Sequence, residues 1–303
     1  MHGTTAGDRP VTLSIGLPVY NGSKYLGAAI ESLLAQTFTD FELIINDNAS
    51  TDETWDVCRE YARRDPRVRI FREEVNTGAV RNHNKVIELS RGRYFKWAAH
   101  DDLYDPRFLE VCIARLEAAP EAVLAFSRAR FIDPEGRPLH EHRHPLDFSV
   151  RDPGALFLQY VLANHVMIED YGVIRMDVLR RTSLLGNFIW SDMVLFGELA
   201  LWGPFIEVPE VLFFRREHPG RAMVANKDAR ALAAWNDPRN AGKRALPTWR
   251  IIAEHMASLR RAPLSMGQRL RLAAGVMRRA NWHRGQLAAE LWNALRPARP
   301  RTG

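Results

Sequence analysis

Short β-rich runs alternate with amphipathic helical segments over the first 126 residues, and this alternation restricts the fold more than any other feature. Runs of β-branched and aromatic residues predict strands, whereas apolar residues at spacings of three and four predict helices. Strands separated by helices pair in parallel, so the sequence predicts an α/β fold with a doubly wound, mainly parallel sheet flanked by helices. The strands are expected at 11–17, 41–45, 68–71, 94–98 and 122–126, and the helices at 26–34, 55–62, 80–90 and 108–116.

The regular alternation ends near Phe131, and the second half of the chain has a looser pattern. A β-rich run over 206–214 contains Pro209, which favours an edge strand or a break. Further elements are expected as helices at 156–166 and from 190, a short strand at 171–174, and proline-separated helices over 228–295. We divide the chain into an extended or disordered N-terminus (1–10), a first half (11–127), a second half of the same domain (128–225) and a helical C-terminal extension (226–303).

Composition and cysteine content exclude several classes of protein. The 46% hydrophobic and 26% charged residues of this 303-residue chain are ordinary for a globular protein, which argues against disorder. No apolar run approaches the roughly 18 residues that a membrane-spanning helix needs, and the first residues lack a secretory pattern. The two cysteines, Cys58 and Cys112, fall on apolar helix faces, so we expect reduced core residues in a cytoplasmic protein.

Positive charge is concentrated at the C-terminal end. Ten arginines against one acid, Glu290, give residues 260–303 a net charge of +9, which leaves −3 for the first 259 residues. The high pI of 9.6 therefore comes from the arginines of the extension. We expect no nucleic-acid partner for the main domain, because its own net charge is slightly negative.

Two neighbouring carboxylates, Asp101 and Asp102, follow the buried strand expected at 94–98. In an α/β sheet this places them at the carboxyl end of a strand, where ligands bind, and carboxylates with phosphate oxygens suit a hard divalent cation. The other interpretation is a helix start, with Asp105 as its N-cap. A second candidate metal cluster, His140, His142 and His144, lacks a partner at a known spacing, and we interpret it as a solvated loop.

Several polar loops together resemble a known family. The matching pieces are Leu17 to Gly22, Ser32 to Phe38, Asn46 to Asp52, Asn76 to Gly78 with Arg81 and Asn82, and Asp101-Asp102 with Pro106. In this order they are similar to the nucleotide-sugar-binding half of the family 2 glycosyltransferases, which have the GT-A fold. The resemblance covers more than a third of the chain and assigns nucleotide-sugar binding to 11–127 and acceptor binding to 128–225.

The resemblance implies a set of nucleotide contacts. Among them, Asp47 corresponds to a residue that hydrogen-bonds the base. From the residues alone, Asp47 is also compatible with an Asx turn, Arg81 with a solvated surface and His100 with a packed loop. The implied nucleotide-binding residues are Pro18, Val19, Tyr20, Asn21, Asp47, Asn76, Arg81, His100 and Asp101.

The resemblance also implies a Mg²⁺ or Mn²⁺ cofactor and a catalytic base. The family usually carries an Asp-x-Asp metal signature, whereas Ala99 stands two positions before Asp101 here, so the sequence does not separate Asp101 from Asp102 as the metal ligand. Asp192, at the start of a predicted helix, matches the base that takes the acceptor proton; the alternative is a helix-stabilising acid. His218 matches a residue that contacts the diphosphate or the metal.

The implied function is inverting transfer of a hexosyl or deoxyhexosyl group from a nucleotide-diphosphate sugar to a glycan or lipid-linked acceptor, in polysaccharide, glycolipid or cell-envelope glycan synthesis. The alternatives are a non-catalytic nucleotide-sugar-binding or scaffolding protein on the same fold, and nucleic-acid binding through the basic extension. The arginines near Trp282 and Trp292 are compatible with a solvated face or with peripheral contact at the anionic inner face of the cell membrane.

Overall fold

The computed structural model describes residues 11–225, 228–243 and 246–295, and within these the strands form one nine-stranded sheet. The prediction for residues 1–10 lies outside the described residues. The first half follows the expected order of strands and helices. Its elements are β1 (Leu13–Val19), α1 (Ser23–Leu34), β2 (Phe41–Asp47), α2 (Thr54–Arg64), β3 (Val68–Arg72), α3 (Ala79–Glu88), β4 (Tyr94–Trp97), β5 (Leu103–Tyr104) and α4 (Phe108–Ala118).

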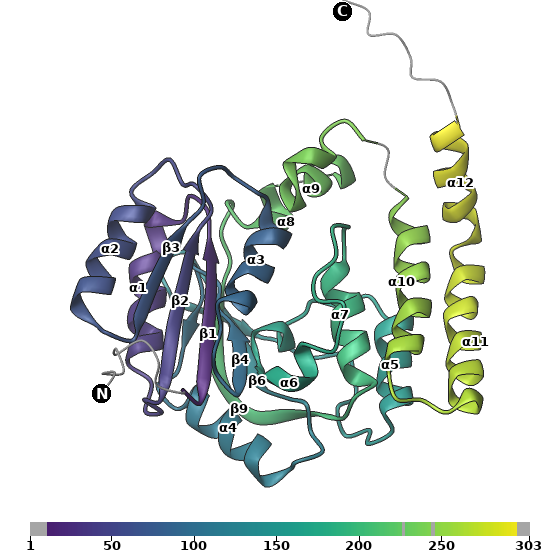
Figure 1. Cartoon of the computed structure of the whole chain (residues 1–303), viewed down its shortest axis with the longest axis horizontal. Helices are drawn as coiled ribbons and strands as arrows, with labels where there is room; N and C mark the ends of the chain where they lie inside the picture. The colour runs from purple at the N-terminus through teal and green to yellow at the C-terminus, as the bar shows by residue number, and fades with distance from the viewer. Residues whose placement is uncertain (1–10, 226–227, 244–245, 296–303) are drawn as a thin grey trace, which may run out of the picture.

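The sheet has the strand order β3-β2-β1-β4-β8-β6-β9-β5, with β7 paired to β6. β1 pairs in parallel with both β2 and β4, and β2 with β3, because helical crossovers return the chain to the same end of the sheet. The helices α1 and α2 cover one side of β1 to β3, and α3 covers the other (Figure 1). This confirms the predicted α/β class and the doubly wound, mostly parallel sheet.

The second half completes the sheet with antiparallel and parallel strands. β8 joins β4 to β6 by antiparallel pairing, whereas β9 pairs in parallel with β6. Pro209 lies inside β9, which continues past it: β5 pairs with β9 only at Phe213 and Phe214, so the part around Pro209 is an edge that pairs with β6 alone, and a β-bulge shifts the register there from Val208 to Val211. The elements are β6 (Leu124–Ile132), β7 (Pro138–Glu141), α5 (Pro153–Leu162), η1 (Glu169–Tyr171), β8 (Val173–Arg175), α6 (Met176–Leu179), α7 (Ser191–Ala200) and β9 (Phe205–Arg216).

The C-terminal helices pack on α5 and α7 around a second apolar core. Phe157 and Val161 of α5 meet Ile252 and Leu259 of α10 and Leu272 of α11 in this cluster. The helices α10 to α12 form the end of the molecule opposite α2 (Figure 1). The elements are α8 (Ala222–Ala225), α9 (Ala229–Asn236), η2 (Pro238–Asn240), α10 (Pro247–Arg261), α11 (Met266–Trp282) and α12 (Arg284–Leu295).

Both cysteines are free and buried, as predicted, and no helix among the described residues has the length and apolarity that crossing a membrane requires.

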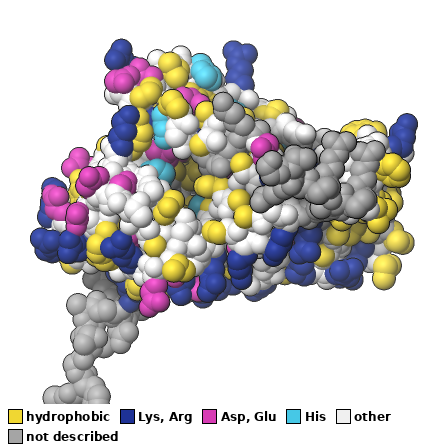
Figure 2. Space-filling view, turned by 90° about the horizontal axis from the view of Figure 1, so that it is seen from above, with side chains coloured by type: hydrophobic (Ala, Val, Ile, Leu, Met, Phe, Trp, Pro, Cys, Tyr) yellow, Lys and Arg dark blue, Asp and Glu magenta, His cyan; other side chains and the backbone are white. Residues whose placement is uncertain are grey.

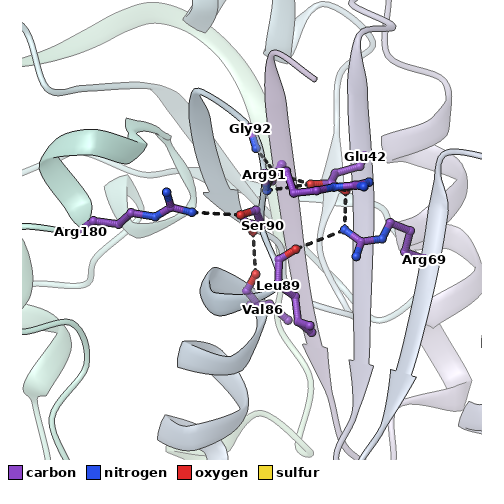
Figure 3. A network of polar contacts seen from close by, with 9 residues as sticks. Glu42, Arg69, Val86, Leu89, Ser90, Arg91, Gly92 and Arg180 are labelled. Atoms are coloured by element: carbon purple, nitrogen blue, oxygen red, sulfur yellow. Dashed lines mark hydrogen bonds and ion pairs between the residues drawn. The ribbon is translucent and has the colours of Figure 1, made fainter. Parts of the chain in front are cut away.

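A buried carboxylate ties the strands together at the amino end of the sheet. Glu42 of β2 accepts hydrogen bonds from Ser14 Oγ at 2.7 Å, from Arg69 Nη1 at 2.6 Å and from the Arg91 backbone N–H at 3.0 Å (Figure 3). Burial alone would raise the pKa of Glu42, but the hydrogen bonds from Arg91, Ser14 and Arg69 outweigh it and lower the pKa. The network joins β1, β2, β3 and the turn before β4.

We expect Glu42→Gln to reduce the free energy of unfolding by about 2 to 3 kcal/mol, because the two arginines and Ser14 would lose their shared anion. Since the pKa of Glu42 is lowered on folding, this contribution is present above its ordinary value of 4.5 and is lost as the pH falls through the folded-state pKa. Urea unfolding at neutral and acidic pH measures both effects. Glu60→Gln, in an exposed ion pair with Arg64, is the matched control and should cost less than about 1 kcal/mol. Equal losses in the two variants would contradict the interpretation.

Candidate functional site

A cavity of about 570 Å³ lies at the carboxyl ends of β1, β2 and β4. Parallel pairing places these ends at one edge, since Val19 of β1 is opposite Asp47 of β2 and Gly16 is opposite Trp97 of β4. The second half supplies the opposite wall through the segment after α5, the start of α7 and the end of β9. The cavity therefore joins the two halves that the sequence analysis distinguished.

Most of the predicted nucleotide-binding residues line this cavity. They are Pro18, Val19, Tyr20, Asn21, Asn76, His100 and Asp101. The loops that carry them are held by side chains of the polar elbow after β2: Ser50 Oγ accepts from the Asn21 backbone N–H at 2.9 Å, and Asn48 Oδ1 accepts from the Thr77 backbone N–H at 2.9 Å. Asn48 also lines the cavity and was not predicted.

Two predicted nucleotide contacts lie elsewhere. Asp47 is fully buried, accepts from the backbone N–H of Ser50 three residues on at 3.1 Å, and forms an ion pair with Arg72 Nε at 3.1 Å. Arg81 is exposed on α3. Neither residue is part of the cavity lining, and their nucleotide contacts stay predictions.

Backbone strain is concentrated around the cavity. Within the described residues, four non-glycine residues have positive φ: Asn21 (48°), Ala49 (62°), Leu184 (56°) and Trp190 (69°). Asn21 and Trp190 line the cavity, and the other two are adjacent to lining residues. Left-handed backbone is costly for a side chain as bulky as tryptophan, and such residues cluster where a site requires them.

The two adjacent carboxylates have different environments. Asp101 Oδ2 is 2.8 Å from His218 Nε2, whereas Asp102 Oδ1 accepts from the Arg216 backbone N–H at 2.8 Å. Arg216 Nε also donates to the Asp101 carbonyl at 2.9 Å, so β9 fixes the position of both residues. A carboxylate beside an imidazole fits a divalent cation such as Mn²⁺, and carboxylate oxygens fit Mg²⁺.

Their pKa values move in opposite directions. Burial would raise the pKa of Asp101, but the hydrogen bond from His218 and the nearby charges of His100, His218 and Arg221 lower it. Burial and then the Asp101 charge raise the pKa of Asp102 to about 7. Asp101 is therefore the ionised member of the pair, and its carboxylate is the better ligand for a cation.

Asp192 lies in the first turn of α7 and lines the same cavity. Its Oδ1 accepts from the Met193 backbone N–H at 2.9 Å, and burial raises its pKa. The left-handed Trp190 turns the chain into α7 two residues before it. One cavity thus contains the predicted base, the carboxylate pair and the loops predicted to bind a nucleotide.

Two further residues, Asp170 and Arg215, line the cavity. Asp170 Oδ1 and Arg215 Nε are buried and have no hydrogen-bond partner, and both side chains line the cavity. Burial raises the pKa of Asp170 to about 8, with Glu169, Asp192 and Asp102 adding to the effect and Arg215 opposing it. An unpartnered acceptor and an unpartnered donor in one cavity are available to a polar ligand.

The segment that carries Asp170 is held on both sides. Glu169 accepts from Tyr160 Oη at 2.6 Å, His165 Nε2 at 3.0 Å, His144 Nε2 at 2.9 Å and the Ile168 backbone N–H at 2.9 Å. On the other side, the buried Lys96 Nζ donates to the Tyr171 carbonyl at 3.0 Å. Asp170, between them, is consequently positioned by its neighbours and not by contacts of its own.

The His144, His165 and Glu169 ligand atoms lie within 4.8 Å of one another, as in a metal site. His144 Nδ1, however, accepts from the Leu146 backbone N–H at 3.2 Å, which places the imidazole proton on the Nε2 that faces Glu169. This favours a hydrogen-bonded carboxylate over metal ligation. The prediction of a solvated loop was wrong for His144, whose side chain is 3% exposed, because the loop folds back onto Glu169.

Part of the C-terminal extension closes over the cavity. Trp235, Asn236 and Pro238, from α9 and η2, belong to its lining. The approach depends on Gly78 before α3, which has a φ of 88° and whose absent Cβ would lie 2.3 Å from the Asn236 carbonyl oxygen. The division of the chain at residue 226 stays an interpretation, since residues beyond it contribute to the same cavity.

Comparisons with known proteins agree with this geometry. The chain is 36% identical to Escherichia coli chondroitin synthase over 124 residues, which is 41% of this chain and 18% of that protein. A protein of Sinorhizobium fredii is 31% identical over 247 residues, which is 81% of this chain and 25% of that protein, so the chain spans only part of the length of these two relatives.

Solved structures share the fold. S. aureus TarS in complex with UDP-GlcNAc matches with a TM-score of 0.65 and 14% identity over 93% of this chain and 80% of that one. The mannosyltransferase PcManGT of Pyrobaculum calidifontis, in complex with GDP-Man and Mn²⁺, matches with a TM-score of 0.54 and 16% identity over 94% and 85% of the two chains. These likenesses confirm the GT-A-like fold that the resemblance implied.

The family assignment rests on sequence. The profile of glycosyl transferase family 2 matches residues 14–182, more than half of the chain and the part that contains β1 to β8. The chain therefore belongs to glycosyl transferase family 2.

Proposed function

We propose that the protein is a metal-dependent, inverting glycosyltransferase that moves a sugar from a nucleotide-diphosphate sugar to an acceptor hydroxyl. The observation that carries this proposal is the single cavity that joins the nucleotide loops, Asp101 and Asp192; His218 contacts Asp101 from outside the lining. The similar TarS structure holds UDP-GlcNAc and the similar PcManGT structure holds GDP-Man with Mn²⁺, which supports a nucleotide-sugar donor.

The nucleotide would bind in the first half. Residues Pro18 to Asn21 and Asn76 supply the loops that line its side of the cavity, and His100 lies beside Asp101. Asp47 and Arg81 take part in this proposal only through the family resemblance, with Asp47 as the base contact. Trp235 and Pro238 would close the cavity over the bound nucleotide and exclude water.

Asp101 and His218 would hold the divalent cation, because Asp102 is more deeply buried and already accepts the Arg216 N–H. When bound, the cation supplies positive charge that stabilises the leaving diphosphate. Asp102 then orders the strand end through Arg216.

Asp192 would accept the proton of the acceptor hydroxyl while the oxygen of that hydroxyl forms a bond to the anomeric carbon of the donor sugar. The bond from that carbon to the diphosphate breaks on the opposite face, so the configuration inverts and the diphosphate leaves with the electron pair. Burial of Asp192 raises its pKa, which makes it a stronger base than an exposed carboxylate once ionised.

Asp170 and Arg215 would bind hydroxyls of the transferred sugar. The unpartnered Asp170 Oδ1 can accept a hydrogen bond, and the unpartnered Arg215 Nε can donate one. Neighbouring hydroxyls of a sugar can supply both the donor and the acceptor. In this proposal the transferred group is a hexosyl or deoxyhexosyl group. We further propose a cytoplasmic enzyme of polysaccharide, glycolipid or cell-envelope glycan synthesis.

The alternative is a non-catalytic nucleotide-sugar-binding protein, which Ala99 favours because the first Asp of the usual metal signature is absent. Nucleotide binding without donor hydrolysis or transfer would support this alternative.

We expect Asp192→Asn to reduce kcat by about 10²- to 10⁴-fold and to leave donor binding unchanged, because the amide cannot take the acceptor proton. Release of nucleoside diphosphate from a panel of UDP- and GDP-sugars measures the rate, and calorimetry measures binding. Asp177→Asn, at an exposed position on α6, is the control and should retain activity. Full transfer by Asp192→Asn would exclude its role as the base.

We expect Asp101→Ala to weaken UDP or GDP binding in the presence of Mn²⁺ by on the order of 10- to 100-fold, with little change when the metal is absent. Titration calorimetry with and without Mn²⁺ measures the difference. Asp105→Ala removes a carboxylate from the following helix start, outside the cavity lining, and should keep the metal dependence. The same result for both variants would contradict the metal role.

We expect Asp170→Asn to stabilise the fold while raising the KM for the donor. The folded-state pKa of about 8 exceeds the ordinary value of 3.8, so Asp170 lowers the free energy of unfolding progressively as the pH rises between these values. The Tm advantage of the variant should therefore be larger at pH 8 than at pH 5. A destabilised variant would indicate a structural role, and an unchanged KM would remove Asp170 from sugar binding.

A further inference from the structure

The outer side of α11 exposes large apolar side chains. Met266, Leu270 and Met277 are 67%, 67% and 57% exposed. They are spaced by four and seven residues and so share one side of the helix, whereas Leu272 and Val276 on the other side are fully buried in the second core. α12 repeats the arrangement with Leu295, which is 80% exposed, four residues after Leu291. These side chains are mostly exposed and do not belong to the second apolar core.

Arginines accompany the apolar row. Arg278 and Arg284 are exposed and have no carboxylate partner among the described residues, and the Arg278 guanidinium lies over the ring of the exposed Trp282 at 5.4 Å. The single acid of α11 and α12, Glu290, is turned inward and accepts from the Thr248 backbone N–H at 3.1 Å. Figure 2 shows hydrophobic and basic side chains together at the right-hand end of the molecule, which α10 to α12 form.

We propose that the outer face of α11 and α12, defined by Met266, Leu270, Met277, Arg278, Trp282, Arg284 and Leu295, binds the surface of an anionic membrane. The apolar side chains would enter the boundary between headgroups and acyl chains, and the arginines would contact lipid phosphates. This inference rests on the proposed function for its purpose, since it would bring the cavity to a lipid-linked acceptor.

Charge argues against the other occupants of this face. In a symmetric pair of chains the same arginines would approach one another, and no exposed acid on these two helices would compensate them. A nucleic acid would match the arginines but would leave Met266, Leu270 and Leu295 exposed to water. An anionic bilayer satisfies both kinds of side chain at once.

The test is flotation of the full chain with vesicles of phosphatidylcholine alone and of phosphatidylcholine mixed with phosphatidylglycerol. We expect binding to the mixed vesicles only. Arg278→Gln/Arg284→Gln should weaken it by roughly thirtyfold, from the electrostatic contribution of two basic residues. Leu270→Ser/Met277→Ser should weaken it without changing its salt dependence. Arg63→Gln/Arg64→Gln on α2, at the opposite end of the molecule, is the charge-matched control and should bind as the unmodified chain does.

Three outcomes would overturn the inference: no vesicle binding, concentration-dependent dimerisation that Leu270→Ser/Met277→Ser abolishes, or oligonucleotide binding that depends on Arg278 and Arg284 and exceeds vesicle binding. Unchanged Tm values and unchanged UDP or GDP binding in the variants would show that they fold. Vesicle binding needs no catalysis, so an inactive protein that floats with anionic vesicles would overturn the proposed function and leave this inference standing. An active protein that does not float would do the reverse.

Discussion

Parallel pairing of β1 with both β2 and β4 is the constraint on which the site depends. It aligns the ends of three strands, so that the loops after Val19, Asp47 and Trp97 meet at one edge although they lie far apart in the sequence. Helical crossovers enforce this alignment, because each returns the chain to the opposite end of the sheet before the next strand begins. Polar loop residues that would be unrelated in another fold thereby become walls of one cavity. Because the strand ends are aligned, each loop contributes only a few residues to the nucleotide side of the cavity.

The acceptor side is built by a different means. Its segment after α5 has little regular structure, and a buried carboxylate organises it: Glu169 receives four hydrogen bonds, while Lys96 of β4 holds the carbonyl of Tyr171. These contacts join the second half to the central strand and leave Asp170 facing the cavity. β9 adds a second connection. Its residue Arg216 contacts both Asp101 and Asp102, although β8 and β6 lie between β9 and β4 in the sheet.

The two kinds of construction explain what the sequence could predict. The elements of 11–126 follow from local periodicity, and the loop residues follow from their positions after strands, so the fold and most of the cavity lining could be expected. Pro209 follows from local sequence in the same way, since it lies at a bulge in the part of β9 that pairs with β6 alone. The environments of Asp170 and His144 could not be expected, because they depend on residues distant in sequence. The roles of Asp101 and Asp102 separate only through His218 and Arg216, which arrive from β9.

The opposite edges of the sheet differ in how their polar groups are satisfied. At the amino end, Glu42 is surrounded by donors and its network is complete without a ligand. At the carboxyl end, Asp170 Oδ1 and Arg215 Nε are buried without partners, and Asn21 and Trp190 have left-handed backbone. Unpaired buried groups and strained residues cost stability. Buried polar atoms without hydrogen-bond partners also lie outside the cavity, for example in Trp202 and His255, but a ligand in the cavity can reach only those that line it. A ligand that supplied one donor and one acceptor to Arg215 and Asp170 would therefore recover part of the cost of leaving them unpaired.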